Sequence, residues 1–124
     1  MGAYLRKKTQ AATLVLLTAL STLFGCEAER RKSDAELGLN PQQAAGRRVF
    51  DAQCARCHAA YSSRALQGPT LQGVLTRQYL PSGVPANDER VADVIRLGRG
   101  KMPGYSRVLN DQQINDLIVY LHTL

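Results

Sequence analysis

Hydrophobic residues recur every three to four positions in three segments of the chain, a spacing that predicts three amphipathic helices. In the first segment Asn40 precedes Pro41, and Gln43 follows at the spacing of a capping box. We therefore expect a helix over residues 41 to about 54. The positions expected on its buried face are Gly46, Val49 and Phe50. The glycine would let another helix approach closely.

The other two helices begin with the same kind of cap. Asn87 precedes the second segment, which Gly98 ends, and Asn110 precedes the third, where Gln113 completes another capping box. The apolar residues of the second helix are Val91, Val94, Ile95 and Leu97. Those of the third are Ile114, Leu117, Ile118 and Leu121.

The segments between these helices read as loops. Residues 61–80 are rich in Gly, Gln, Ser and Thr, with a short helix expected near residues 71–79, and residues 80–85 are rich in turn-forming residues. No stretch alternates as a strand, so the predicted fold class is all-α, with three or more helices and long loops. Loops this long in so small a domain indicate a buried cofactor that supplies part of the apolar interior.

The first 26 residues resemble a bacterial lipoprotein leader. A basic stretch at residues 6–8 precedes an apolar run, too short for a bilayer span of roughly 20 residues, and Leu23-Phe24-Gly25-Cys26 resembles a lipobox. We expect a signal peptide over residues 1–25, lipidation of Cys26, and a polar tether over residues 26–39. An ordinary leader or an uncleaved anchor is the alternative. The predicted leader and lipidated Cys26 together indicate a lipoprotein that is anchored to a bacterial membrane and faces the periplasm or the outer face of that membrane.

The net charge does not indicate a nucleic-acid partner. The formal charge is +6, but three of the 16 basic residues lie in the predicted leader, which leaves 13 against 10 acidic residues and a charge of about +3. The remaining basic residues are scattered and lack interleaved aromatic residues.

Residues 54–58, Cys-Ala-Arg-Cys-His, have the spacing of a covalent attachment site for haem c. Two thiols on one turn can add to the two vinyl groups of a haem, and the adjacent His58 can then ligate the iron. A zinc site would need further ligands, and only His122 remains. A redox dithiol would need a βαβ setting that this sequence lacks. We therefore expect Cys54 and Cys57 to bind one haem.

Met102 is the only methionine after the predicted leader and the expected sixth ligand to the iron. It stands on a turn-rich loop flanked by Gly100 and Pro103, a poor position for a core side chain. The rival ligand is His122, near the end of the last helix, where histidine commonly complements the helix dipole.

Together, the attachment motif, Met102 and the predicted helices make the segment 40–124 resemble a class I c-type cytochrome of the bacterial, monohaem type. In that family the first and last helices cross each other. The residues that resemble those at the crossing are Gly46 and Phe50 on the first helix and Leu117 and Tyr120 on the last. Gly68-Pro69-Thr70-Leu71 resembles the segment whose proline carbonyl accepts a hydrogen bond from the proximal histidine, so the resemblance implies this role for Pro69 toward His58. The sequence offers no obvious set of residues for the haem propionates, and Arg64 reads as a solvated surface charge.

The expected function is one-electron transfer between redox protein partners, without catalysis, a small-molecule substrate or a nucleic-acid partner. Ligation by His58 and Met102 would keep the iron saturated and favour the ferrous state. The alternatives are a tethered haem subunit of a larger respiratory or dehydrogenase complex and a ligand sensor in which Met102 is displaced.

Overall fold

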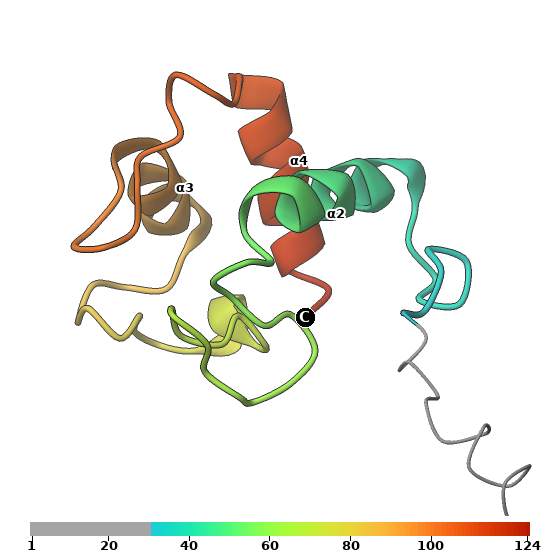
Figure 1. Cartoon of the computed structure of the whole chain (residues 1–124), viewed down its shortest axis with the longest axis horizontal. Helices are drawn as coiled ribbons and strands as arrows, with labels where there is room; N and C mark the ends of the chain where they lie inside the picture. The colour runs from blue at the N-terminus through green and yellow to red at the C-terminus, as the bar shows by residue number, and fades with distance from the viewer. Residues whose placement is uncertain (1–30) are drawn as a thin grey trace, which may run out of the picture. The chain divides into compact units, whose positions relative to one another are not determined.

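The computed structural model describes residues 31–124, of which residues 33–124 form one compact unit. Its elements are α2 (Pro41–Gln53), the 3₁₀ helix η2 (Val74–Thr76), α3 (Asp88–Leu97) and α4 (Asp111–Leu121). Figure 1 shows α2 crossing α4, with α3 on the other side of α4 and long loops between the helices. Within this part of the chain there are isolated bridges but no β-strand, and the all-α prediction is confirmed. No helix of residues 31–124 is long and apolar enough to cross a membrane.

The predicted caps form as local hydrogen bonds. Asn40 Oδ1 accepts from the Gln43 amide at 2.9 Å, and Gln43 Oε1 accepts from the Asn40 amide at 2.9 Å. Asn110 and Gln113 make the same pair of bonds at 2.9 and 3.0 Å. Because each cap satisfies amides that the first helical turn leaves without a partner, these four-residue patterns fix where α2 and α4 begin.

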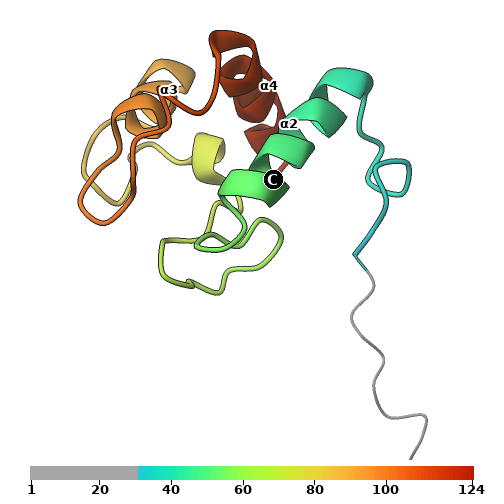
Figure 2. The same ribbon diagram turned by 45° about the horizontal axis from the view of Figure 1, so that its top comes forward.

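The crossing of α2 and α4 forms the densest part of the core. A Cβ at Gly46 would overlap the backbone carbonyl oxygen of Asp116 and lie 2.7 Å from Tyr120 Cβ, so only glycine permits this approach. The rings of Phe50 and Tyr120 pack at 5.6 Å between centroids, and Tyr120 is 0% exposed. Its hydroxyl group donates to the Tyr61 hydroxyl at 2.8 Å. The crossing implied by the resemblance is present, and Figure 2 shows it from a second angle.

Two local expectations differ from the structure. Leu97, expected on the apolar face of α3, is 79% exposed because the helix ends there and Gly98 turns the chain away with φ +75°. The helix expected near residues 71–79 is the single 3₁₀ turn η2, which is held to the C-terminus by a hydrogen bond from the Gly73 amide to the Leu124 carbonyl at 2.9 Å.

The compact unit begins at residue 33, seven residues before the predicted domain boundary at residue 40. Arg47 on α2 is only 8% exposed, and its Nη1 lies 2.6 Å from Asp34 Oδ1. Burial alone would lower the pKa of Arg47, but the hydrogen bond to Asp34, together with the charges of Tyr61, Asp34 and Asp51, outweighs burial and leaves this pKa raised. Leu39 also packs against the core. Residues 33–39 therefore belong to the folded unit, whereas Cys26 and the predicted leader lie outside the described residues.

Candidate cofactor site

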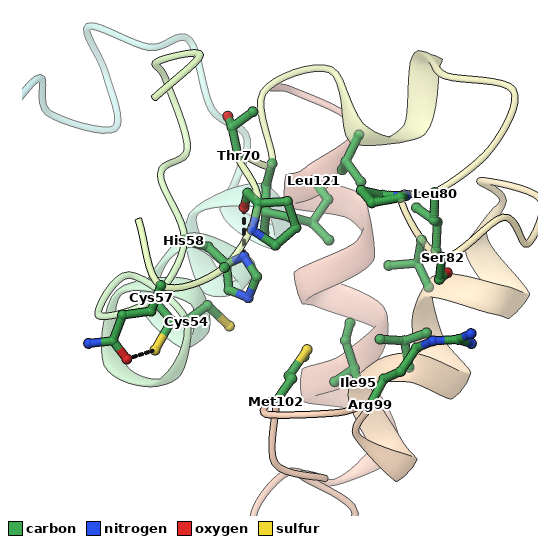
Figure 3. A pocket seen from close by; sticks show the side chains of 18 of the residues that line it. Cys54, Cys57, His58, Thr70, Leu80, Ser82, Ile95, Arg99, Met102 and Leu121 are labelled. Atoms are coloured by element: carbon green, nitrogen blue, oxygen red, sulfur yellow. Dashed lines mark hydrogen bonds between the residues drawn. The ribbon is translucent and has the colours of Figure 1, made fainter. Parts of the chain in front are cut away.

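A cavity of about 350 Å³ lies between the loop of residues 54–87, the loop of residues 98–110, and the inner faces of α3 and α4. Side chains from all four segments line it, and most are apolar. Four side chains predicted to bind the cofactor are among them: Cys54, Cys57, His58 and Met102. Figure 3 shows these side chains on the walls of this one pocket, with the sulfur of Met102 directed into it.

The end of α2 positions both thiols. Cys54 is the C-cap of the helix, and its amide donates to the Phe50 carbonyl at 2.8 Å. The amides of Cys57 and His58 then donate to the Cys54 carbonyl at 3.0 and 2.9 Å, which forms one tight turn. Burial, with a smaller effect of Cys57, raises the pKa of the Cys54 thiol to about 11. This turn holds two thiols and an imidazole along one wall of the cavity.

The imidazole of His58 is oriented by the segment predicted for that purpose. Nδ1 lies 2.8 Å from the Pro69 carbonyl oxygen and must donate to it, because a carbonyl oxygen can only accept. In the neutral ring this leaves Nε2 unprotonated, as a metal ligand requires. Gly68 lies flat against the ring, since a Cβ at that position would overlap Cε1 and lie 2.8 Å from Nδ1.

Met102 stands on a tight turn at the end of α3. The amides of Arg99 and Met102 each donate to the other's carbonyl at 3.0 Å, and Gly100 between them has φ +58°. A Cβ at Gly98 would lie 2.5 Å from the Met102 carbonyl oxygen, and one at Gly104 would lie 2.7 Å from the Arg96 carbonyl oxygen. The glycines therefore let the loop fold back against its own helix, which fixes where the thioether points.

Tyr105 joins the two halves of the site. Its hydroxyl group donates to the Gln53 carbonyl at 3.0 Å, beside Cys54, and its amide donates to the Ile95 carbonyl at 2.9 Å. Burial, with smaller effects of Cys54 and Cys57, raises the pKa of Tyr105 and keeps its phenol a neutral donor. The sequence analysis did not identify this residue, because its partner lies 52 positions away.

His122 does not reach the cavity. Its Nε2 lies 2.8 Å from Asp88 Oδ1 on the surface, and its side chain is 51% exposed. Arg64 is exposed and does not line the cavity either. Arg77, Ser82 and Arg99 line the cavity and are among the polar residues that were not predicted there. The one signal in the sequence that could have identified Arg99 is its position three residues before Met102.

Comparisons with known proteins agree with this geometry. The family described as "Cytochrome C oxidase, cbb3-type, subunit III" matches residues 41–121. Cytochrome c6 of Picosynechococcus is 31% identical over 110 residues, which cover 86% of this chain and 87% of that protein. Cytochrome c6 of Tetradesmus obliquus is 32% identical over 79 residues, or 64% of this chain and 86% of that one. The solved structure of cytochrome c6 from the diatom Phaeodactylum tricornutum superposes with a TM-score of 0.51 at 27% identity, covering 64% of this chain and 88% of the diatom protein.

Proposed function

The chain belongs to the class I monohaem c-type cytochromes, which carry one haem c and act as electron carriers rather than enzymes, and we propose that Cys54 and Cys57 attach its haem while His58 and Met102 ligate the iron. The observation that carries the proposal is the convergence of these four side chains on one apolar cavity. His58 and Met102 are 44 positions apart in sequence and stand on different loops.

The residues around the cavity fit haem c in both shape and charge. Leucine, valine and isoleucine side chains from η2, α3 and α4 provide apolar walls for a porphyrin. A haem also carries two propionate carboxylates, and the cavity offers them two guanidinium groups, from Arg77 and Arg99, together with the Ser82 hydroxyl. Figure 3 places Ser82 and Arg99 at the end of the pocket away from the two cysteines, as a haem with vinyl and propionate edges requires.

Bound haem supplies a one-electron couple between ferrous and ferric iron. The protein's residues set its surroundings. Pro69 and Gly68 hold the imidazole of His58 in one orientation and one tautomer. Glycines 98 and 104 fix the loop that presents the thioether of Met102. The apolar walls exclude water, so little solvent would need to rearrange when the charge of the iron changes by one unit.

The attachment is tested by extraction with acidified organic solvent, which removes haem that is not covalently bound. The wild-type protein should keep its haem, and a Cys54→Ser/Cys57→Ser double variant should release it. Cys26→Ser serves as the control, because it replaces the third cysteine of the chain, leaves the attachment turn intact and should retain the haem. Release of haem from the wild-type protein would overturn the proposal.

We also propose that the protein is exported and held to a membrane by a lipid on Cys26. Support comes from the basic stretch, the short apolar run and Leu23-Phe24-Gly25 before that cysteine. Several acyl chains on one cysteine anchor far more firmly than one. Intact mass should give a mature chain that starts at Cys26 and carries lipid, and Cys26→Ser should yield soluble, coloured protein. If that variant stays with membranes without detergent, another anchor holds the protein.

A second candidate function is that of a haem subunit fixed in a larger respiratory complex. The observation that favours it is the matched family, which is described as subunit III of a cbb3-type cytochrome c oxidase. Purification in mild detergent separates the two functions. A free carrier emerges alone, whereas a fixed subunit emerges in constant ratio with other membrane proteins.

A further inference from the structure

One hydrogen bond ties the loop that carries Met102 to the end of α2. Residues 98–110 connect α3 to α4 and turn back on themselves between Arg99 and Met102. Among the residues that the structure describes, the hydrogen bonds of residues 98–109 stay inside this loop or reach the last turn of α3, with one exception. The exception is the hydroxyl group of Tyr105, which donates to the Gln53 carbonyl at 3.0 Å.

The backbone of Tyr105 is fixed on the α3 side of that bond. Its amide donates to the Ile95 carbonyl at 2.9 Å, and its carbonyl accepts from the amides of Val108 and Leu109, each at 2.9 Å. Its side chain lines the cavity and packs against the buried core. Because the residue is already held in this way, the bond to Gln53 requires little further ordering of the chain.

The acceptor on α2 has no helical donor of its own. Gln53 is the last residue of the helix, so its carbonyl is among those that an α-helix leaves without an intrahelical partner. The amide four residues later, that of Cys57, donates to the Cys54 carbonyl instead. The Tyr105 hydroxyl takes the place of that amide, directly beside the first attachment cysteine. It therefore joins the cysteine side of the cavity to the methionine side.

We propose that Tyr105 is a positioning residue that holds Met102 on the iron by bonding the middle of the Met102 loop to the end of α2. The proposal rests on the proposed function, because it takes Met102 as the sixth ligand. Only three positions separate Met102 from Tyr105, whereas the buried Leu109 lies seven positions away. If the loop moves outward with the thioether, the Tyr105 bond breaks. The bond therefore lowers the population of molecules in which the iron is open.

The test measures the equilibrium affinity of the ferric protein for imidazole, which binds only where Met102 has left the iron. The apparent affinity is proportional to the fraction of open molecules. Loss of one hydrogen bond raises that fraction, so Tyr105→Phe should bind imidazole about fivefold more tightly than wild type. The titration is followed in the visible spectrum, where loss of the sulfur-to-iron charge-transfer absorption reports the departure of Met102.

Two controls separate a positioning role from a general effect on the fold. In a Met102→Ala background the iron is already open, so the addition of Tyr105→Phe should leave the imidazole affinity unchanged. Tyr120→Phe also removes a phenol donor, which lies 2.8 Å from its acceptor on Tyr61, but Tyr120 does not line the cavity. That variant should lose stability and keep the wild-type affinity for imidazole.

Equal imidazole affinities of wild type and Tyr105→Phe would overturn the inference. Equal tightening by Tyr105→Phe in the Met102→Ala background would also overturn it, because a change in the cavity wall would then explain the affinity. So would equal tightening by Tyr120→Phe, since a looser fold would suffice. A wild-type protein that lacks the charge-transfer absorption, or that binds imidazole as tightly as Met102→Ala, refutes the proposed function instead.

Discussion

The imidazole ring of His58 lies so close to Gly68 that a Cβ at position 68 would stand 2.8 Å from Nδ1 and 3.0 Å from Nε2. The same ring donates to the Pro69 carbonyl at 2.8 Å. The amide of Gly68 in turn donates to the Cys57 carbonyl at 2.8 Å, so the glycine cannot move away without breaking this loop from the attachment turn. Position 68 therefore controls the orientation of the proposed proximal ligand.

Substitution Gly68→Ala should displace the imidazole or the loop. Overpacking of this kind costs about 1 to 3 kcal/mol of folding free energy. The weakened bond to Pro69 should also lower the basicity of the ligand and alter the reduction potential. Urea unfolding and potentiometry measure the two effects. Ser63→Ala, an exposed change in the same loop, should leave both unchanged, and an unaltered Gly68→Ala protein would contradict the assigned role.

Substitution Met102→Ala should remove the thioether ligand and open the iron. The ferric protein should lose its sulfur-to-iron charge-transfer absorption, the reduction potential should fall, and the ferrous protein should bind carbon monoxide readily. His122→Ala is the control, because His122 faces Asp88 at 2.8 Å and does not line the cavity. Rapid binding of carbon monoxide by the wild-type ferrous protein would instead favour a ligand sensor.

Substitution Asp34→Asn should detach the segment before α2. Arg47, which is 8% exposed, would then lose its 2.6 Å contact with the Asp34 carboxylate and keep the longer pair with Asp51 at 3.9 Å. We expect the free energy of unfolding to fall by about 1 to 2 kcal/mol, since Asp34 is itself partly solvated. Asp93→Asn breaks the exposed pair with Arg90 and should cost less than about 0.5 kcal/mol. Equal losses of unfolding free energy in the two variants would show that the burial of Arg47 does not strengthen its ion pair with Asp34.

Substitution Tyr120→Phe should change how stability depends on pH. Burial, with the hydrogen bond to Tyr61, raises the pKa of Tyr120 above its ordinary value of 10.0. The folded state therefore favours the neutral phenol, and the stability that this contributes is present below pH 10 and is lost as pH rises above it. At pH 7 the variant should lose about 1 kcal/mol with its hydrogen bond. Between pH 7 and pH 11 its unfolding free energy should fall less than that of wild type.

Tyr79→Phe is the matched control for that experiment, because Tyr79 is 54% exposed. Its unfolding free energy should follow the wild-type pH dependence throughout. If Tyr120→Phe and wild type lose the same free energy between pH 7 and pH 11, the buried phenol does not govern alkaline stability. Denaturant unfolding at the two pH values measures all three proteins.

The local features of this protein follow from its sequence alone. The capping boxes at Asn40 and Asn110 fix the starts of α2 and α4, because their hydrogen bonds join residues only three positions apart. The attachment turn at residues 54–58 is equally local. Met102 could be preferred to His122 in advance, because it is the single methionine of residues 26–124 and stands on a turn-rich loop, and its ligand role stays a prediction.

Only the tertiary structure decided which distant groups meet. The approach of Gly68 to His58, the bond from Tyr105 to Gln53 and the pairing of Asp34 with Arg47 each join residues that no short pattern relates. The same holds for Arg77 and Arg99, which reach the cavity from different loops. Local hydrogen bonds are encoded within one or two turns of chain, whereas these contacts depend on how the helices cross. That crossing is set by the whole buried surface, with Gly46 determining how closely α2 approaches α4.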